Sequence, residues 1–154
     1  MVSAVMSMTL FVEPSQADFG KQLDCLTQNI YFEARGESPL GQLAVGLVTL
    51  NRVKDDRWPD TICEVVKQAN KDSSGNIILN ECQFSWYCDG NSDVVPDNEA
   101  ASLARDIAFL LMTQDIKDFT KGSNYFHATY VKPAWRKQVE MTIEIGYHIF
   151  YRRD

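Results

Sequence analysis

Apolar residues recur at intervals of three and four along several stretches of the chain, which is the spacing of one face of an α-helix. This pattern predicts helices over residues 24–35, 40–53, 61–68 and 98–113. The second of these has the clearest stripe, formed by Leu43, Leu47 and Leu50. Ser38 and Pro39 precede it as an N-cap and a first-turn proline, so this helix is expected to begin there.

Segments rich in β-branched and aromatic residues lie between and after these helices. A turn cluster precedes Ile77–Leu79, as in a β-hairpin, and residues 120–133 are predicted as loop or strand. The apolar tail Met141–Tyr151 is predicted as a strand. With no repeat and no linker, the pattern predicts a single, mainly helical α+β domain with a small β-hairpin region.

The N-terminus, residues 1–20, is predicted to be a signal remnant or a disordered segment, and residues 21–154 the folded domain. Ser15–Ala17 resembles a small-residue cleavage site after an apolar stretch. No Lys or Arg precedes Lys21, so the positive start of a secretory signal is missing. We favour export, to the periplasm or the cell exterior.

The net charge of −6 argues against nucleic-acid binding, which depends on clustered Lys and Arg that neutralise phosphates. The 45% apolar content of the 154 residues is enough for one core, and we expect a monomer. No stretch of about 18 or more apolar residues follows the N-terminus, so no membrane-spanning helix is predicted there.

The four cysteines permit two disulfides with three possible pairings. Cys82 and Cys88 bracket a short loop and are the easiest pair to close, which would leave Cys25 with Cys63. Two disulfides would imply an oxidising compartment. Zinc is the alternative, but the chain has no C-x2-C pair and both histidines lie far from the cysteines in sequence.

Glu33 is the residue that departs most clearly from the helical pattern. It continues the apolar face of Leu26 and Ile30, and Gly36 marks the end of the same helix. Burial and the negative end of a helix dipole both disfavour the charged carboxylate and raise its pKa. A general acid needs such a raised pKa to keep its proton near neutral pH. The alternative is that Glu33 is an ordinary charged residue at a solvated helix end.

Other charged residues accompany this glutamate. Arg35 is expected to pair with Glu33 or Glu37, and Glu37 is a supporting residue that suits the start of the next helix. Asn51 and Arg52, at the end of that helix, are expected to support packing.

Several polar and aromatic residues are candidates for ligand contacts, because aromatic faces stack on sugar rings and amides bond sugar hydroxyls. They are Gln83, Phe84, Ser85, Trp86, Tyr125, His127 and Trp135. A stapled core lid is an equal alternative for the loop between Cys82 and Cys88, and a lone His such as His127 is more often structural. No metal site and no cofactor is predicted, since the chain contains no phosphate loop and no zincin motif.

Nine segments of the chain match a known family in the order in which the family has them. They are Tyr31–Glu37, Gly41–Val45 with Asn51–Val53, Thr61–Val66, Cys82–Trp86 with Cys88–Gly90, Tyr125–His127, Pro133–Trp135 and Ile145–Arg152. Together they resemble the spore-cortex-lytic cell wall hydrolase family of the SleB type.

This resemblance implies a lysozyme-like fold that acts on peptidoglycan glycan strands, with Glu33 as the catalytic acid. It further implies a lytic transglycosylase, which cleaves the β-1,4 bond after N-acetylmuramic acid, leaves a 1,6-anhydro end and needs one carboxylate instead of two. The alternatives are a hydrolytic muramidase or glucosaminidase, a noncatalytic glycan-binding wall protein, and a thiol-dependent amidase or peptidase. The wall would be that of the producing cell or, for a phage enzyme, that of the host.

Overall fold

A computed structural model describes residues 16–154 as four α-helices, two 3-10 helices and five strands. The helices are α1 (Gln16–Ala34), α2 (Pro39–Val53), α3 (Ile62–Val66) and α4 (Glu99–Thr113), with the 3-10 helices η1 (Ser85–Cys88) and η2 (Ala134–Gln138). The strands are β1 (Ala69–Lys71), β2 (Ile77–Cys82), β3 (Tyr125–Ala128), β4 (Glu140–Ile145) and β5 (His148–Arg152). Most of the predicted signal remnant lies outside the described residues.

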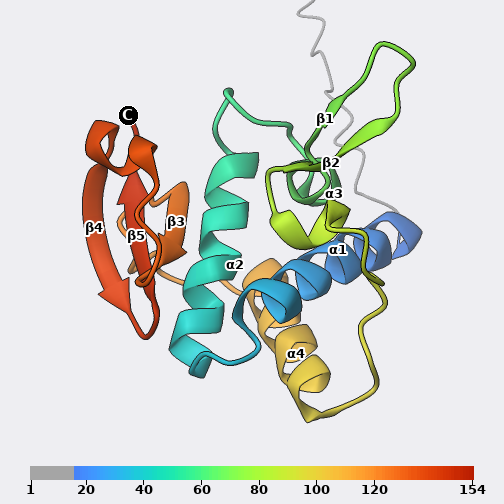
Figure 1. The fold of residues 1–154 in the computed structure, drawn as a ribbon. Coiled ribbons are helices and arrows are strands. Elements are labelled where there is room, and N and C mark those ends of the chain that lie inside the picture. The colour runs from blue at the N-terminus through green and yellow to red at the C-terminus, as the bar shows by residue number, and fades with distance from the viewer. Residues whose placement is uncertain (1–15) are drawn as a thin grey trace, which may run out of the picture.

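Helix α2 lies between the three-stranded antiparallel sheet, in the order β3-β5-β4, and the pair of helices α1 and α4 (Figure 1). The β1–β2 hairpin lies beside α3, on the side of the molecule away from that sheet (Figure 1). One apolar core fills the space between α1, α3 and α4, and a smaller one joins α2 to the sheet through Val45, Val48 and Phe150. The architecture is the mixed, mainly helical class that the sequence predicts.

The predicted start of α2 is confirmed. The Ser38 hydroxyl accepts a hydrogen bond from the Gly41 backbone N–H at 3.3 Å, and Pro39 opens α2. Helix α2 is buried on more sides than its leucine stripe indicates, because it packs against helices on one side and the sheet on the other. Helix α1 starts earlier than predicted, at Gln16 instead of position 24.

The prediction of one strand over Met141–Tyr151 is wrong. The structure has a hairpin there, in which β4 and β5 pair around a turn at Gly146–Tyr147. Gly146 has a φ of 57°, a conformation that glycine adopts without steric cost. Both flanking strands are β-branched and aromatic, so the composition on either side of the glycine conceals the reversal.

The disulfides are Cys25–Cys63 and Cys82–Cys88, as predicted. All four cysteines are therefore paired, which excludes both a thiol nucleophile and a zinc site built on these thiols. Within residues 16–154, no helix has the length and apolar character needed to cross a membrane.

Candidate active site

Glu33 occupies the penultimate position of α1, as the helical pattern predicts. The chain turns immediately afterwards, and the Glu37 backbone N–H bonds back to the Ala34 carbonyl at 2.9 Å. This turn leaves the glutamate in the lining of a cavity of about 630 Å³, a size typical of ligand sites.

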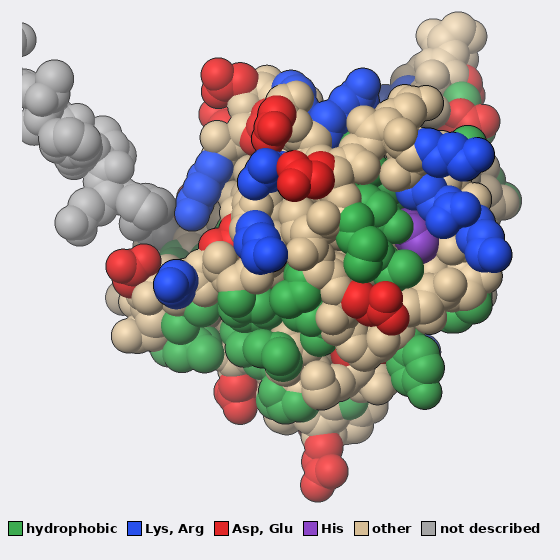
Figure 2. Space-filling model, turned by 90° about the vertical axis from the view of Figure 1, so that its left-hand side faces the viewer, with side chains coloured by type: hydrophobic (Ala, Val, Ile, Leu, Met, Phe, Trp, Pro, Cys, Tyr) green, Lys and Arg blue, Asp and Glu red, His purple; other side chains and the backbone are tan. Residues whose placement is uncertain are grey.

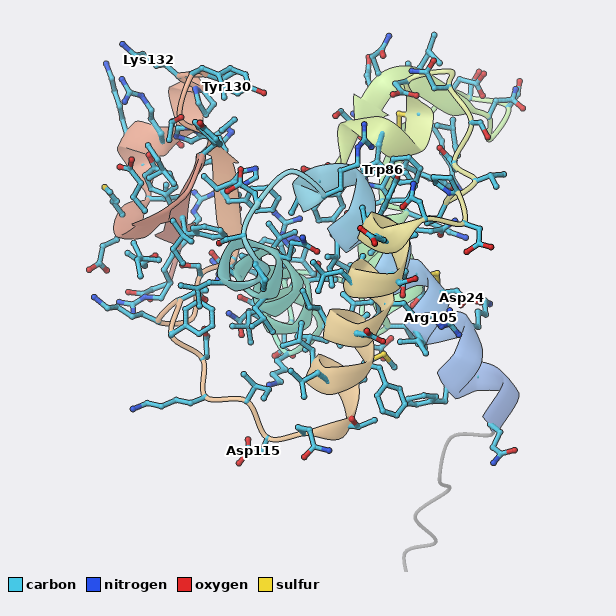
Figure 3. The ribbon with its side chains drawn as sticks, turned by 90° about the horizontal axis from the view of Figure 1, so that it is seen from below. Asp24, Trp86, Arg105, Asp115, Tyr130 and Lys132 are labelled. Atoms are coloured by element: carbon cyan, nitrogen blue, oxygen red, sulfur yellow. A yellow bond between two sulfur atoms is a disulfide. The ribbon has the colours of Figure 1, made fainter. Side chains whose placement is uncertain are left out.

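The cavity has two walls of different origin. Residues 82–91, around η1, form one wall, and β3 with the following loop forms the other. Trp86 and the pair Tyr130 and Lys132 lie on opposite sides of this region when the molecule is seen from below (Figure 3). A shallower pocket of about 400 Å³ continues past Glu33 toward Tyr147. Because both cavities share Glu33, an elongated ligand can extend to either side of this carboxyl group.

Burial raises the pKa of Glu33 to about 7, while the nearby positive charge of Arg52 opposes the rise. The desolvation of the carboxylate is the larger of the two effects. At neutral pH the group therefore exists as comparable populations of acid and base. One side chain with this property can donate a proton and later take one back.

Arg52 is a site residue whose role the sequence analysis restricted to packing. It is 2% exposed, its Nε donates to the Asn124 carbonyl at 2.8 Å, and its guanidinium lies 5.1 Å from the Phe84 ring centroid. Its Nη1 is buried with no hydrogen-bond partner among the described residues. The helical spacing from Val48 places this cation on a buried face, which is the same signal that identified Glu33.

Substitution of Glu33 by Gln is expected to change how stability depends on pH. Between about pH 4.5 and about pH 7 the unfolded carboxyl loses its proton while the folded one keeps it, so the stability of the native protein falls as pH rises. Over this pH range the unmodified protein is expected to lose about 3 kcal/mol of its free energy of unfolding through Glu33. Glu33→Gln has no carboxyl group here and does not lose it. Urea unfolding of both proteins at about pH 4 and about pH 8 measures it. If the free energies of unfolding of the two proteins differ by the same amount at both pH values, the pKa of Glu33 is not raised by burial.

Glu37 holds two parts of the fold together and lines the pocket of about 400 Å³, but not the cavity of about 630 Å³. Its Oε2 accepts a hydrogen bond from the Tyr147 backbone N–H at 3.1 Å, and its Oε1 lies 3.9 Å from His148 Nδ1. A side chain at Gly146 would collide with this carboxylate. Glu37 thus anchors the β4–β5 turn to the segment that precedes α2.

His148 lines the cavity beside Glu33. Burial is the main effect on its pKa and lowers it, whereas the Glu37 carboxylate partly opposes that change. Its ring packs against that of Phe126 at 5.2 Å between centroids, which gives it a structural role. It also brings a neutral imidazole to the wall next to the acid.

His127 has both ring nitrogens occupied. Nδ1 lies 2.8 Å from the Ala128 carbonyl, which can only accept, so this nitrogen carries the proton. Nε2 then accepts a hydrogen bond from the Tyr151 hydroxyl at 2.9 Å. The histidine therefore contributes a fixed ring to the cavity wall and no free base.

The structure separates the predicted ligand contacts into two groups. Five line the cavity, namely Gln83, Phe84, Ser85, Trp86 and His127. Tyr125 and Trp135 do not; they pack against each other at 5.4 Å between centroids, and Trp135 lies 5.6 Å from Tyr151. The sequence analysis missed Tyr130, which is 82% exposed at the rim of the cavity.

Trp86 is more buried than a sugar platform needs to be, at 7% exposed. Its indole N–H donates to Asn29 Oδ1 at 3.0 Å, and its ring stacks on Phe32 at 4.9 Å. Trp86 thus joins the η1 wall to α1 beside Glu33. Tyr130 is the aromatic side chain with the most open face along this cavity.

Asn51 and Arg35, the other residues expected to support the site, lie in different surroundings. Asn51 donates to Asp118 Oδ2 and to the Ser123 carbonyl, both at 2.9 Å, and so fixes the loop that precedes β3. Arg35 is exposed at the cavity mouth, with its guanidinium 5.1 Å from the Tyr31 ring centroid.

The family model described as Cell Wall Hydrolase matches residues 36–151, a region that begins three residues after Glu33. A spore cortex-lytic enzyme of Halalkalibacterium halodurans is 28% identical over 128 residues, which are 83% of this chain and 34% of that protein. The chain thus spans about a third of the length of this curated relative.

Two solved structures share the fold. The catalytic domain of the germination-specific lytic transglycosylase SleB from Bacillus anthracis matches with a TM-score of 0.64 and 27% identity, over 90% of this chain and 97% of that one. The catalytic domain of the Bacillus cereus SleB protein matches with a TM-score of 0.59 and 25% identity, over 86% and 91%.

Proposed function

The chain belongs to the Cell Wall Hydrolase family, and on this premise we propose that it cleaves peptidoglycan glycan strands as a lytic transglycosylase. The bond cut is the β-1,4 linkage between N-acetylmuramic acid and N-acetylglucosamine, and the product carries a 1,6-anhydromuramic end. The observation that carries the proposal is Glu33, a carboxyl whose pKa desolvation raises to about 7 and which lines two adjoining cavities. Residues 21–154 are the catalytic module, which acts in the periplasm or outside the cell.

One carboxyl group carries both proton transfers in this mechanism. Protonated Glu33 donates its proton to the glycosidic oxygen as the bond to the muramoyl anomeric carbon breaks. The resulting carboxylate removes the proton of the muramoyl 6-hydroxyl, whose oxygen bonds to the same carbon. Glu33 is then protonated again, and no water is consumed. The positive charge of Arg52 stabilises the carboxylate that forms between the two steps.

The cavity walls supply contacts suited to sugars. Gln83 and Ser85 are exposed on the η1 side and provide amide and hydroxyl groups for sugar hydroxyls. Tyr130, exposed on the opposite side, presents an aromatic face on which a sugar ring can stack. These walls position the scissile bond above Glu33.

Mass spectrometry of the fragments released from purified peptidoglycan tests the chemistry. A transglycosylase releases 1,6-anhydromuramic ends, which are lighter by one water than the reducing ends from hydrolysis. We expect anhydro ends to dominate, because the 6-hydroxyl is the nucleophile. Reducing ends that take up ¹⁸O from labelled water would contradict the proposal.

Asp89 supports a hydrolytic alternative at the same site. Its side chain lines the cavity on the η1 side, and a hydrogen bond from Asn91 lowers its pKa, so it is ionised at neutral pH. An inverting hydrolase uses such a second carboxylate to activate water. Asp89→Asn would then lose activity by about a hundredfold or more, whereas the transglycosylase mechanism predicts a cleavage rate close to that of the unmodified protein.

A further inference from the structure

Positive charge is concentrated in one segment of this acidic protein. Between Asp118 and Glu140 the chain has four cations and no Asp or Glu, although the net charge of the whole is −6. Three of these cations, Lys132, Arg136 and Lys137, follow closely on the cavity residue Tyr130. We call these three residues the basic rim.

The basic rim is open to ligands. Lys132 and Lys137 are exposed, Arg136 is half-buried, and within residues 16–154 none of the three forms an ion pair. Lys132 points outward beside Tyr130, on the side of the structure opposite Trp86 (Figure 3). The space-filling view shows Lys and Arg side chains gathered around a His and next to a hydrophobic patch (Figure 2). Positive charge left uncompensated beside a binding cavity favours an anionic ligand group.

The rim residues follow Tyr130 and Val131 of one cavity wall without lining it, and the η1 wall carries the opposite charge. Asp89 lies there with its carboxylate bound to the Asn91 backbone N–H at 2.8 Å. The field across the cavity therefore favours a ligand whose negative groups all project to one side. In a stem-bearing glycan the sugars are neutral, because the lactyl carboxyl of muramic acid forms the amide to the stem. The sugars gain little from this field, so the charge must recognise the groups beyond that amide.

We propose that the basic rim binds the carboxylates of the peptide stem attached to the muramic acid residue that lies in the cavity. The inference rests on the proposed function, since it takes peptidoglycan as the ligand. The stem is joined to the sugar ring through a lactyl group, so a glycan held in the cavity brings its carboxylates to the rim at high effective concentration. A separate anionic polymer has no such tether, which is why the stem is the assigned ligand.

Binding assays in a Glu33→Gln background test the proposal, because the ligand then stays intact. The two ligands are soluble glycan oligomers with stems and the same oligomers stripped of stems by an amidase, with the lactyl carboxylate that this exposes capped as a methyl amide. At low salt the parent is expected to bind the stem-bearing oligomer roughly fivefold more tightly. Lys132→Gln/Lys137→Gln is expected to remove this preference and to leave the affinity for stripped oligomers unchanged.

The matched control is Lys54→Gln/Lys117→Gln, which removes two exposed lysines outside the cavity walls. It is expected to keep the preference. Loss of the preference in both variants, its persistence without Lys132 and Lys137, or its absence in the parent would each overturn the proposal. Tighter rim-dependent binding of polyglycerol phosphate than of the stem-bearing oligomer would also overturn it, because phosphate would then be the ligand.

The two proposals fail in different ways. If the unmodified protein, which retains Glu33, cleaves neither oligomer, the transglycosylase assignment fails. Rim-dependent binding of stems can still be measured in that case. If cleavage proceeds and the Lys132→Gln/Lys137→Gln variant keeps the stem preference, only the basic rim assignment fails.

Discussion

Glu33→Gln is expected to lower the rate of glycan cleavage by about a thousandfold or more and to abolish lysis of purified walls. Gln keeps the size of the side chain but carries no acidic proton, so it can neither protonate the glycosidic oxygen nor accept the proton of the 6-hydroxyl. The loss exceeds that from removal of a single contact, because one group serves both steps. The measurement is the initial rate of fragment release by chromatography, alongside the fall in turbidity of a wall suspension.

Glu144→Gln is the matched control, since Glu144 is an exposed residue of β4 outside the cavity. It is expected to cleave at the rate of the unmodified protein. At about pH 5 we expect little change in the melting temperature of either variant, because folded Glu33 is then largely protonated and Gln resembles it. Retained lysis by Glu33→Gln would disprove the assignment of the catalytic acid and favour a different acid in the cavity.

Cys25→Ser/Cys63→Ser is expected to have the largest effect on stability, a loss of about 4 kcal/mol in the free energy of unfolding. The disulfide closes a sequence separation of 38 residues and ties α1 to α3, so its removal frees a long loop in the unfolded chain. Both sulfurs belong to buried residues of the main core, which adds to the loss. Urea unfolding without reductant measures the difference.

Removal of the second disulfide is expected to affect activity more than stability. Cys82–Cys88 has a sequence separation of 6, so the same argument predicts a loss of about 2 kcal/mol from Cys82→Ser/Cys88→Ser. This bridge spans the η1 wall of the cavity, and the cleavage rate is expected to fall more steeply than in the first pair. Equal losses of stability in the two double variants would contradict the loop-entropy account.

The catalytic candidate could be predicted from the sequence because its evidence is local. Glu33 is identified by its spacing from Leu26 and Ile30 within one helix and by Gly36 just after it. The pairing of Cys82 with Cys88 was likewise favoured by a short loop. Signals that span fewer than about ten residues survive in a sequence, because helical period and loop closure act at that range.

The errors and omissions arise where a distant segment decides the outcome. Tyr125 and Trp135 are aromatic and close to His127 in sequence, yet the pairing of β3 with β5 and the packing of η2 turn them into a cluster around Tyr151. Tyr130 follows the end of β3 and reaches the cavity instead. Composition alone cannot distinguish these positions, because all of them suit either a sheet or a sugar site.

By itself the sequence indicated four helices and favoured one disulfide pairing out of three. It also showed the carboxylate out of place at the end of α1 and the excess of positive charge after β3. Only the tertiary structure decided that Arg52 of α2 and His148 of β5 share a cavity with that carboxylate. It also set the pKa of Glu33 near 7. Periodicity indicates which face of a helix is buried. How deeply a residue is buried, and which charges lie near it, depend on segments that can be more than a hundred residues away in the chain.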